Sequence, residues 1–146
     1  MSNPATVSFE TTREVRDACL CLHLQRAARR VARRFDAALQ PLGLTSGQFS
    51  LLMSLNRATP PYLGAVAALL AMDRTTLTAN LKPLARRGLV EISPDENDKR
   101  SRRLALTPAG RASLAAAVPI WRATHAAIEN TVADASRLRA DLLTLC

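Results

Sequence analysis

Two short alternating segments in an otherwise helical pattern constrain the fold of this chain most strongly. Residues 89–93 (LVEIS) and 102–106 (RRLAL) alternate apolar side chains with other residues, a period of two that is typical of strands. The polar segment 94–101 (PDENDKRS) separates them, so the two segments predict an antiparallel hairpin with a long tip. The remaining periodic segments have helical spacing. We therefore predict a mainly α fold with a small β-hairpin.

The composition agrees with this fold class. Apolar residues make up 48% of the 146 residues and aromatic residues only 3%, so the core must be built mainly from Ala, Leu and Val. Such small and branched side chains suit close packing between helices. A chain of this length accommodates one domain of ordinary size. We predict a single domain over residues 1–146.

Long helices are predicted at both ends of the chain. Residues 11–39 contain no Gly or Pro, and their apolar side chains recur on one stripe at helical spacing. Pro41 and Gly43 end this first helix. Residues 107–146 form another helical region, in which Pro119 is expected to produce a kink.

A shorter helix is predicted from residue 46 onward. Thr45 and Ser46 are both candidate N-caps, and Gln48 can reach back to complete a capping box. The apolar side chains of this helix follow at close spacing: Phe49, Leu51, Leu52 and Leu55.

Two further helices follow directly on one another. After a pair of prolines, residues 62–72 predict a helix of about nine residues. Residues 73–88 predict the next helix, with Asp73 as N-cap and Gly88 as the stop signal. Two short helices joined by a tight turn are a helix-turn-helix candidate.

The second helix of this pair has one face rich in small or hydrogen-bonding side chains. Arg can address guanine, Asn can address adenine, and Thr can contact a phosphate or a thymine methyl, so such a face suits the major groove of DNA. An ordinary solvated helix face is the alternative. Leu77, Leu81 and Leu84 form the stripe expected to be buried. The candidate DNA-binding residues of this helix are Arg74, Thr75, Thr76, Thr78, Asn80 and Lys82.

Positive charge is concentrated near the tip of the predicted hairpin. Lys99, Arg100, Arg102 and Arg103 lie there, and Asp98 can pair with Arg100 to hold the guanidinium in place. Arginine is favoured in narrow minor grooves, where the negative potential is strongest. A charged hairpin that only maintains solubility is the alternative. The formal net charge of +8 also favours a polyanionic partner.

Several other classes of protein are disfavoured. The chain contains no phosphate loop, metal tetrad or nucleophile elbow, so we predict neither an enzyme nor a bound cofactor or metal. It lacks an N-terminal apolar stretch typical of export signals and any run of about 18 apolar residues. We therefore expect a cytoplasmic protein with no membrane partner. The odd number of cysteines, three, favours reduced thiols over a disulfide framework.

Three motifs together resemble the MarR family of dimeric winged-helix transcription regulators. They are LTSGQFSLLMSL, VAALLAMDRTTLTANLKPLARRGLV and DENDKRSRRLALTPAG, and the resemblance spans roughly residues 14 to 122. It implies that Arg74, Thr75, Thr76, Thr78 and Asn80 lie on the recognition helix and that Asp98 and Arg100 lie on the wing, where Lys99 and Arg102 are the other candidate DNA contacts. It also implies that residues 10–43 and 108–146 form a helical dimerisation region and residues 44–107 a winged helix-turn-helix region. The Ala- and Leu-rich terminal helices favour such an interface independently.

The resemblance implies two kinds of signal, because MarR-like proteins change DNA affinity on binding a small aromatic or anionic effector or on oxidation of a cysteine. Cys21 falls where the organic-hydroperoxide-sensing branch carries its reactive thiol, and Cys19 and Cys146 are the other redox candidates. On one regular helix, Cys19 and His23 would share a face. The candidates for an effector pocket are His23, Arg26, Met53 and Trp121. Simple packing is the alternative role for all of these side chains.

These patterns predict a homodimeric, sequence-specific DNA-binding transcription regulator. We expect a repressor that binds a pseudo-palindromic operator in double-stranded DNA and is released by an effector or by oxidation. Two alternatives stay open at this point. One is a winged-helix module that contacts another protein, and the other is a DNA-binding protein without sequence preference.

Overall fold

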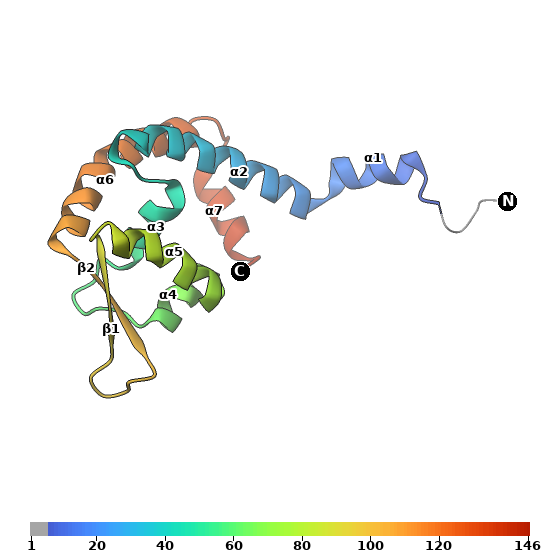
Figure 1. The fold of residues 1–146 in the computed structure, drawn as a ribbon. Coiled ribbons are helices and arrows are strands. Elements are labelled where there is room, and N and C mark those ends of the chain that lie inside the picture. The colour runs from blue at the N-terminus through green and yellow to red at the C-terminus, as the bar shows by residue number, and fades with distance from the viewer. Residues whose placement is uncertain (1–5) are drawn as a thin grey trace.

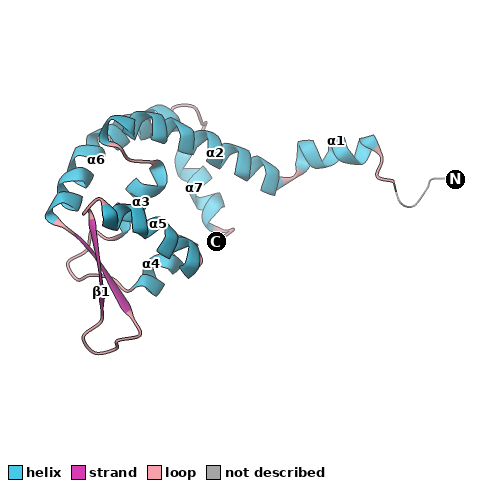
Figure 2. Cartoon of the chain, viewed as in Figure 1, coloured by secondary structure: helices cyan, strands magenta, loops and turns pink. Residues whose placement is uncertain are grey.

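The computed structural model describes residues 6–146, which fold into seven α-helices, one 3₁₀ turn and one hairpin (Figures 1 and 2). The two strands pair antiparallel, with Val90 opposite Leu106 and Pro94 opposite Arg102, so the predicted hairpin is confirmed. The elements in chain order are α1 (Phe9–Ala18), α2 (Leu20–Leu39), η1 (Gln40–Leu42), α3 (Ser46–Ser54), α4 (Leu63–Leu69), α5 (Arg74–Arg86), β1 (Val90–Pro94), β2 (Arg102–Leu106), α6 (Pro108–Glu129) and α7 (Ala135–Leu143).

Local capping fixes where α3 and α5 begin. The Thr45 hydroxyl accepts a hydrogen bond from the Gln48 backbone N–H at 3.1 Å, and the Gln48 side-chain oxygen accepts from the Thr45 N–H at 3.1 Å. This is the predicted capping box, with Thr45 as the N-cap. Asp73 caps α5 by accepting from the Thr76 N–H at 2.7 Å. The turn between α4 and α5 holds Ala71 at a φ of 51°, so the two helices follow each other tightly.

A leucine-rich core joins the hairpin to the helices. Leu77, Leu81 and Leu84 of α5 are fully buried, as the sequence predicts, and they belong to one cluster with Leu39 of α2 and Leu104 of β2. The other largest fully buried side chains are Leu52 and Val66. The recognition helix candidate is therefore held by its apolar stripe, with its opposite face directed to solvent.

The single helix expected over residues 11–39 is wrong. The chain breaks at Cys19, whose backbone is extended with a ψ of 111°, and α1 and α2 are separate helices. Figure 1 shows α1 reaching away from the other elements. Helix α1 has no buried residue, so within the described chain no packing holds it in line with α2.

The C-terminal helical region is divided into two helices. Pro119 lies inside the first, α6, which continues to Glu129. Asp134 then caps α7 through the Arg137 N–H at 2.9 Å.

Helix α4 is seven residues long, two shorter than expected. None of the helices in the described part of the chain is long and apolar enough to cross a membrane.

Gly110 provides a sharp test of this packing. A Cβ at this position would lie 2.0 Å from the backbone oxygen of Leu89, which no side-chain rotation relieves. We expect Gly110→Ala to lower the free energy of unfolding by about 3 kcal/mol or more, as severe overpacking does. Denaturant titration followed by circular dichroism measures it.

The matched control is Gly47→Ala in the first turn of α3. A Cβ there would meet only the Thr45 hydroxyl at 4.0 Å. Its stability should stay within about 1 kcal/mol of the wild type, because alanine is the better helix former. Equal stability of the two variants would contradict the close contact between α6 and the residue before β1.

Candidate nucleic-acid interface

The predicted recognition-helix residues all lie on the exposed side of α5. Arg74, Thr75 and Lys82 make no side-chain hydrogen bond or ion pair within residues 6–146. Three other side chains contact their own neighbourhood: the Thr76 hydroxyl bonds Asp73 at 2.9 Å, the Thr78 hydroxyl bonds the Arg74 carbonyl at 2.8 Å, and the Asn80 amide lies 3.6 Å from the Met72 sulfur.

The wing tip does not contain the expected ion pair between Asp98 and the Arg100 guanidinium. Asp98 instead accepts from the Arg100 backbone N–H at 3.0 Å and bonds the Ser101 hydroxyl at 3.3 Å. A carboxylate two residues ahead of an N–H commonly closes such a turn. The Arg100 side chain is left exposed and unpaired among the described residues, while Arg102 donates to the Lys99 carbonyl at 2.9 Å.

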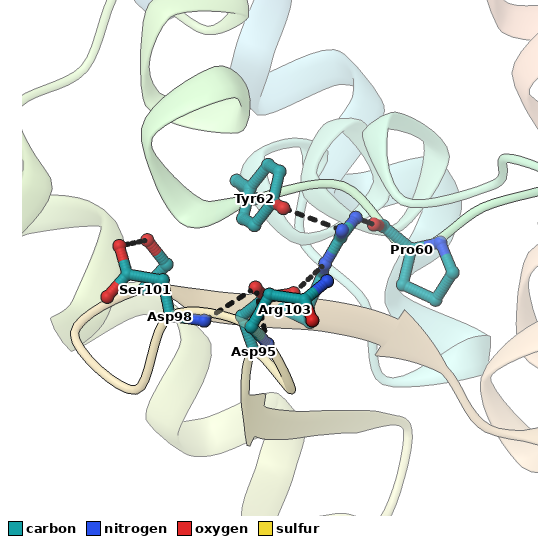
Figure 3. A network of polar contacts seen from close by, with 7 residues as sticks. Pro60, Tyr62, Asp95, Asp98, Ser101 and Arg103 are labelled. Atoms are coloured by element: carbon teal, nitrogen blue, oxygen red, sulfur yellow. Dashed lines mark hydrogen bonds and ion pairs between the residues drawn. The ribbon is translucent and has the colours of Figure 1, made fainter.

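Arg103 does not share the role of its basic neighbours. Its side chain lies between the start of the wing turn and the segment before α4: Nε donates to Asp95 Oδ1 at 2.9 Å and Nη1 donates to the Pro60 carbonyl at 2.7 Å (Figure 3). Nη2 donates to the Tyr62 hydroxyl at 2.7 Å, and the guanidinium carbon lies 3.7 Å from the Tyr62 ring centre. Arg103 therefore ties the wing to the residues that precede α4.

Asp95 is the buried centre of this network, with a side chain only 7% exposed. It also accepts from the backbone N–H groups of Asn97 and Asp98, at 3.2 Å and 3.0 Å. The hydrogen bond from Arg103 holds the pKa of the Asp95 carboxyl below its ordinary value, and the two backbone donors act in the same direction. The sequence pattern groups Arg103 with the basic residues of the tip and does not single out Asp95 or Tyr62. The available signal was the strand period, which puts Arg103 on the opposite face from Arg102.

The four residues proposed for an effector pocket do not come together. Met53 and Trp121 line one cavity of about 430 Å³, together with Phe49, Ser50, Ser54, Asn56, Arg57, Leu69 and Leu70. Its lining is mostly apolar. Trp121 stacks on Phe49 and on His125, with ring centres 6.2 Å and 4.7 Å apart. His23 and Arg26 line a different cleft on α2, with Ala27 and Arg30.

The cysteines are all free thiols in this structure. Cys21 and Cys146 are exposed, whereas Cys19 is half-buried at the joint between α1 and α2. The expectation that Cys19 and His23 share a face of one regular helix is wrong, because Cys19 precedes α2. The Cys19 carbonyl instead bonds the His23 ring nitrogen Nδ1 at 2.8 Å. The Gln25 amide donates to the Cys21 sulfur at 3.3 Å.

Comparisons with known proteins identify this arrangement. A family model described as MarR family matches residues 44–101. The structure of the M. tuberculosis transcriptional regulator MosR in complex with DNA is 40% identical, covers 87% of this chain and 92% of that chain, and has a TM-score of 0.81. CouR from Rhodococcus jostii RHA1 bound to p-coumaroyl-CoA is 25% identical, covers 88% and 92% of the two chains, and has a TM-score of 0.75.

The chain belongs to the MarR family. The family resemblance and the fold class read from the sequence are thus confirmed, and so is the non-enzymatic class, because MarR-family proteins are transcription regulators. The transcriptional activatory protein BadR of Rhodopseudomonas palustris is 33% identical over 95 residues, which cover 63% of this chain. They cover 54% of BadR, so the chain spans about half the length of that relative.

The buried carboxylate of this MarR-family chain gives a pH-dependent prediction. Because the folded-state pKa of Asp95 is lowered, its contribution to stability is complete above the ordinary Asp pKa of about 3.9 and disappears as the pH falls through the lowered value. We expect Asp95→Asn to be less stable than the wild type near pH 7. The difference should shrink steadily as the pH falls below about 4. Urea unfolding of both proteins across this range measures it.

Asp141→Asn is the control, since Asp141 pairs with Arg137 at the surface, where both side chains are more than half exposed. Exposed pairs contribute little, so this variant should match the wild type at every pH. A stability difference for Asp95→Asn that does not change with pH would show that the charge of Asp95 is irrelevant.

Proposed function

We propose that this chain is a homodimeric, sequence-specific DNA-binding transcription regulator that acts as a repressor. The observation that carries the proposal is the joint exposure of two polar surfaces from one continuous segment. Helix α5 exposes Arg74, Thr75 and Lys82, and the wing that follows it exposes Lys99 and Arg100. A helix of this kind suits the major groove, and a basic wing suits the backbone and the adjacent minor groove.

The terminal helices support the proposed dimer. Large apolar side chains remain exposed on α1 and α2 and around α7, a pattern that a monomer rarely maintains. They are Phe9, Val15, Leu20, Leu24, Leu138, Leu142, Leu143 and Leu145. A second copy of the chain would cover them if residues 10–43 and 108–146 form the interface. Two-fold symmetry would then present two copies of residues 44–107 to half-sites about one helical turn apart.

The wing assignment is tested by Arg100→Ala. We expect operator affinity to fall by about 1–3 kcal/mol, the range for loss of a specific contact. Fluorescence anisotropy on duplex DNA from the region upstream of the gene, with a random duplex of equal length at the same salt, gives both affinities. Arg86→Ala in the last turn of α5 removes the same charge away from the N-terminal residues that would enter the groove, and it should leave both affinities unchanged.

These measurements also separate the two alternatives. Equal affinity for the upstream and random duplexes would favour a binder without sequence preference. Absence of binding to either duplex would favour a protein-contact module. An unchanged affinity of a folded Arg100→Ala variant would remove Arg100 from the interface.

An aromatic, anionic effector is one proposed signal. The cavity beside Trp121 supports it, because Phe49, Met53 and Leu69 supply an apolar lining and Arg57 supplies a cation for a carboxylate. The cavity is lined by α3, the segment that follows it, α4 and α6, so an occupant would contact both the helix-turn-helix region and the dimerisation region. The p-coumaroyl-CoA bound by the relative CouR is a ligand of the same aromatic class.

Oxidation of Cys21 is the second proposed signal, and its exposure next to the α1–α2 joint supports it. A hydroperoxide would oxidise the Cys21 thiolate to a sulfenic acid and be reduced to an alcohol. A second thiol, from Cys19 or Cys146, would then displace water and form a disulfide. A disulfide at this joint would change how α1 leaves α2.

One titration distinguishes the two signals. If oxidation is the signal, hydroperoxide should abolish binding to the upstream duplex, reductant should restore it, and Cys21→Ser should be insensitive. Comparison of Cys19→Ser with Cys146→Ser identifies the resolving thiol, since only that variant loses the disulfide. Binding that is unaffected by hydroperoxide but weakened by small aromatic acids, such as 4-hydroxycinnamate, would favour the Trp121 cavity instead.

A further inference from the structure

We propose that a basic pocket between the wing and the start of α4 holds one phosphate of the DNA backbone, and that Arg74 is a phosphate contact. This inference rests on the proposed DNA-binding function. The pocket has a volume of about 360 Å³ and is lined by residues of α4, of α5 and of the wing, which follows them in sequence. They are Tyr62, Leu63, Gly64 and Ala65 around the start of α4, Arg74 at the start of α5, and Arg100, Ser101 and Arg102 of the wing.

The charge of the pocket selects an anion. Three guanidinium groups line it, from Arg74, Arg100 and Arg102, and no carboxylate is among the lining residues. The neighbouring acids are occupied elsewhere: Asp73 caps α5 through Thr76, and Asp98 closes the wing turn. Three cations without a carboxylate partner repel one another, so an oxyanion placed between them relieves that repulsion and gains charge-assisted hydrogen bonds.

Gly64 shapes the pocket around Arg74. A Cβ on Gly64 would lie 2.8 Å from Arg74 Nη2, so the guanidinium lies directly over the start of α4 where a larger residue would displace it. On the wing side, Arg102 donates to the Lys99 carbonyl and Arg103 donates to the Tyr62 hydroxyl. These bonds order Arg102 and Tyr62, whereas Arg74 and Arg100 make no side-chain hydrogen bond among the described residues and would be ordered when the phosphate binds.

The position of the pocket identifies the anion as a DNA phosphate. In the proposed complex, α5 occupies a major groove and the wing tip reaches the adjacent minor groove. One sugar-phosphate strand separates those two grooves, so it must cross the protein between α5 and the wing. The pocket lies at that crossing, between Arg74 and Arg100. Phosphate contacts of this kind fix the register of a protein on the duplex without reading sequence.

This assignment changes the role expected for Arg74. The sequence pattern places it among the base-reading residues, as an arginine suited to guanine. Its guanidinium, however, lies against Gly64 and in the pocket shared with the wing. Base reading then falls to residues further along α5, such as Thr75, Thr78 and Asn80.

Salt dependence of binding to a random-sequence duplex tests the proposal without knowledge of the operator. We expect Arg74→Ala and Arg102→Ala each to reduce the slope of log Kd against log salt by about one, the signature of one lost phosphate contact. The loss of affinity should be the same on random and upstream duplexes. Gly64→Ala keeps every charge but displaces Arg74, so it should weaken binding several-fold at unchanged thermal stability. Arg86→Ala should keep the wild-type slope.

The outcomes separate the pocket from the function on which it rests. A wild-type protein that binds neither duplex removes the proposed function itself, before any variant is compared. If the wild type binds, an Arg74→Ala variant that keeps the full slope and loses discrimination at one base pair overturns the pocket and restores base reading by Arg74. Wild-type affinity in a folded Gly64→Ala variant likewise overturns the placement of Arg74 over α4.

Discussion

The ion pair between Arg103 and Asp95 is the interaction on which the geometry of the DNA-facing surface depends. A two-stranded hairpin is at best marginally stable in water, so a wing must be held by the rest of the domain. Leu104 and Leu106 bury one face of β2, but apolar contacts are non-directional. The Arg103 guanidinium adds direction, since its donors reach Asp95, Pro60 and Tyr62 in one plane.

The same network determines which charges remain available to a ligand. Two of the three acids of the wing turn are used internally: Asp95 holds Arg103 and two backbone N–H groups, and Asp98 holds the turn before Ser101. The third, Glu96, is exposed and makes no side-chain bond among the described residues. Among the described residues, neither Lys99 nor Arg100 at the tip is therefore held in an ion pair. The acidic and basic residues of the turn thus have different roles: Asp95 and Asp98 shape the loop, and Arg100 is exposed to solvent.

Local patterns predicted the local structure well. The capping box at Thr45, the buried leucines of α5 and the antiparallel hairpin all follow from interactions between residues close in sequence or from strand and helix periods. The role of Arg103 could not be predicted, because its partners Pro60 and Tyr62 lie more than 40 residues away. Likewise, Met53 of α3 and Trp121 of α6 line one cavity, and no periodicity relates these two helices. His23 and Arg26 line a separate cleft on α2. The break between α1 and α2 at Cys19 could not be predicted either, because no Gly or Pro lies near it.

A signal received by the terminal helices regulates binding only if it changes the affinity of the protein for DNA. The contacts that join the terminal helices to α5 are therefore the ones to consider. Two such contacts converge on the turn after α2. Asp36 of α2 accepts from the Ser46 N–H at 2.6 Å, at the start of α3. Arg87, directly after α5, donates to the Gly43 carbonyl at 2.7 Å, and Gly43 adopts a φ of 66° that a glycine tolerates. Asp36, near the end of α2, is therefore bonded to the beginning of α3, and Gly43, which follows the 3₁₀ turn after α2, is bonded to the residue after α5. A reorientation of α2 would act on these two bonds, which join the proposed dimerisation region to the proposed DNA-binding region.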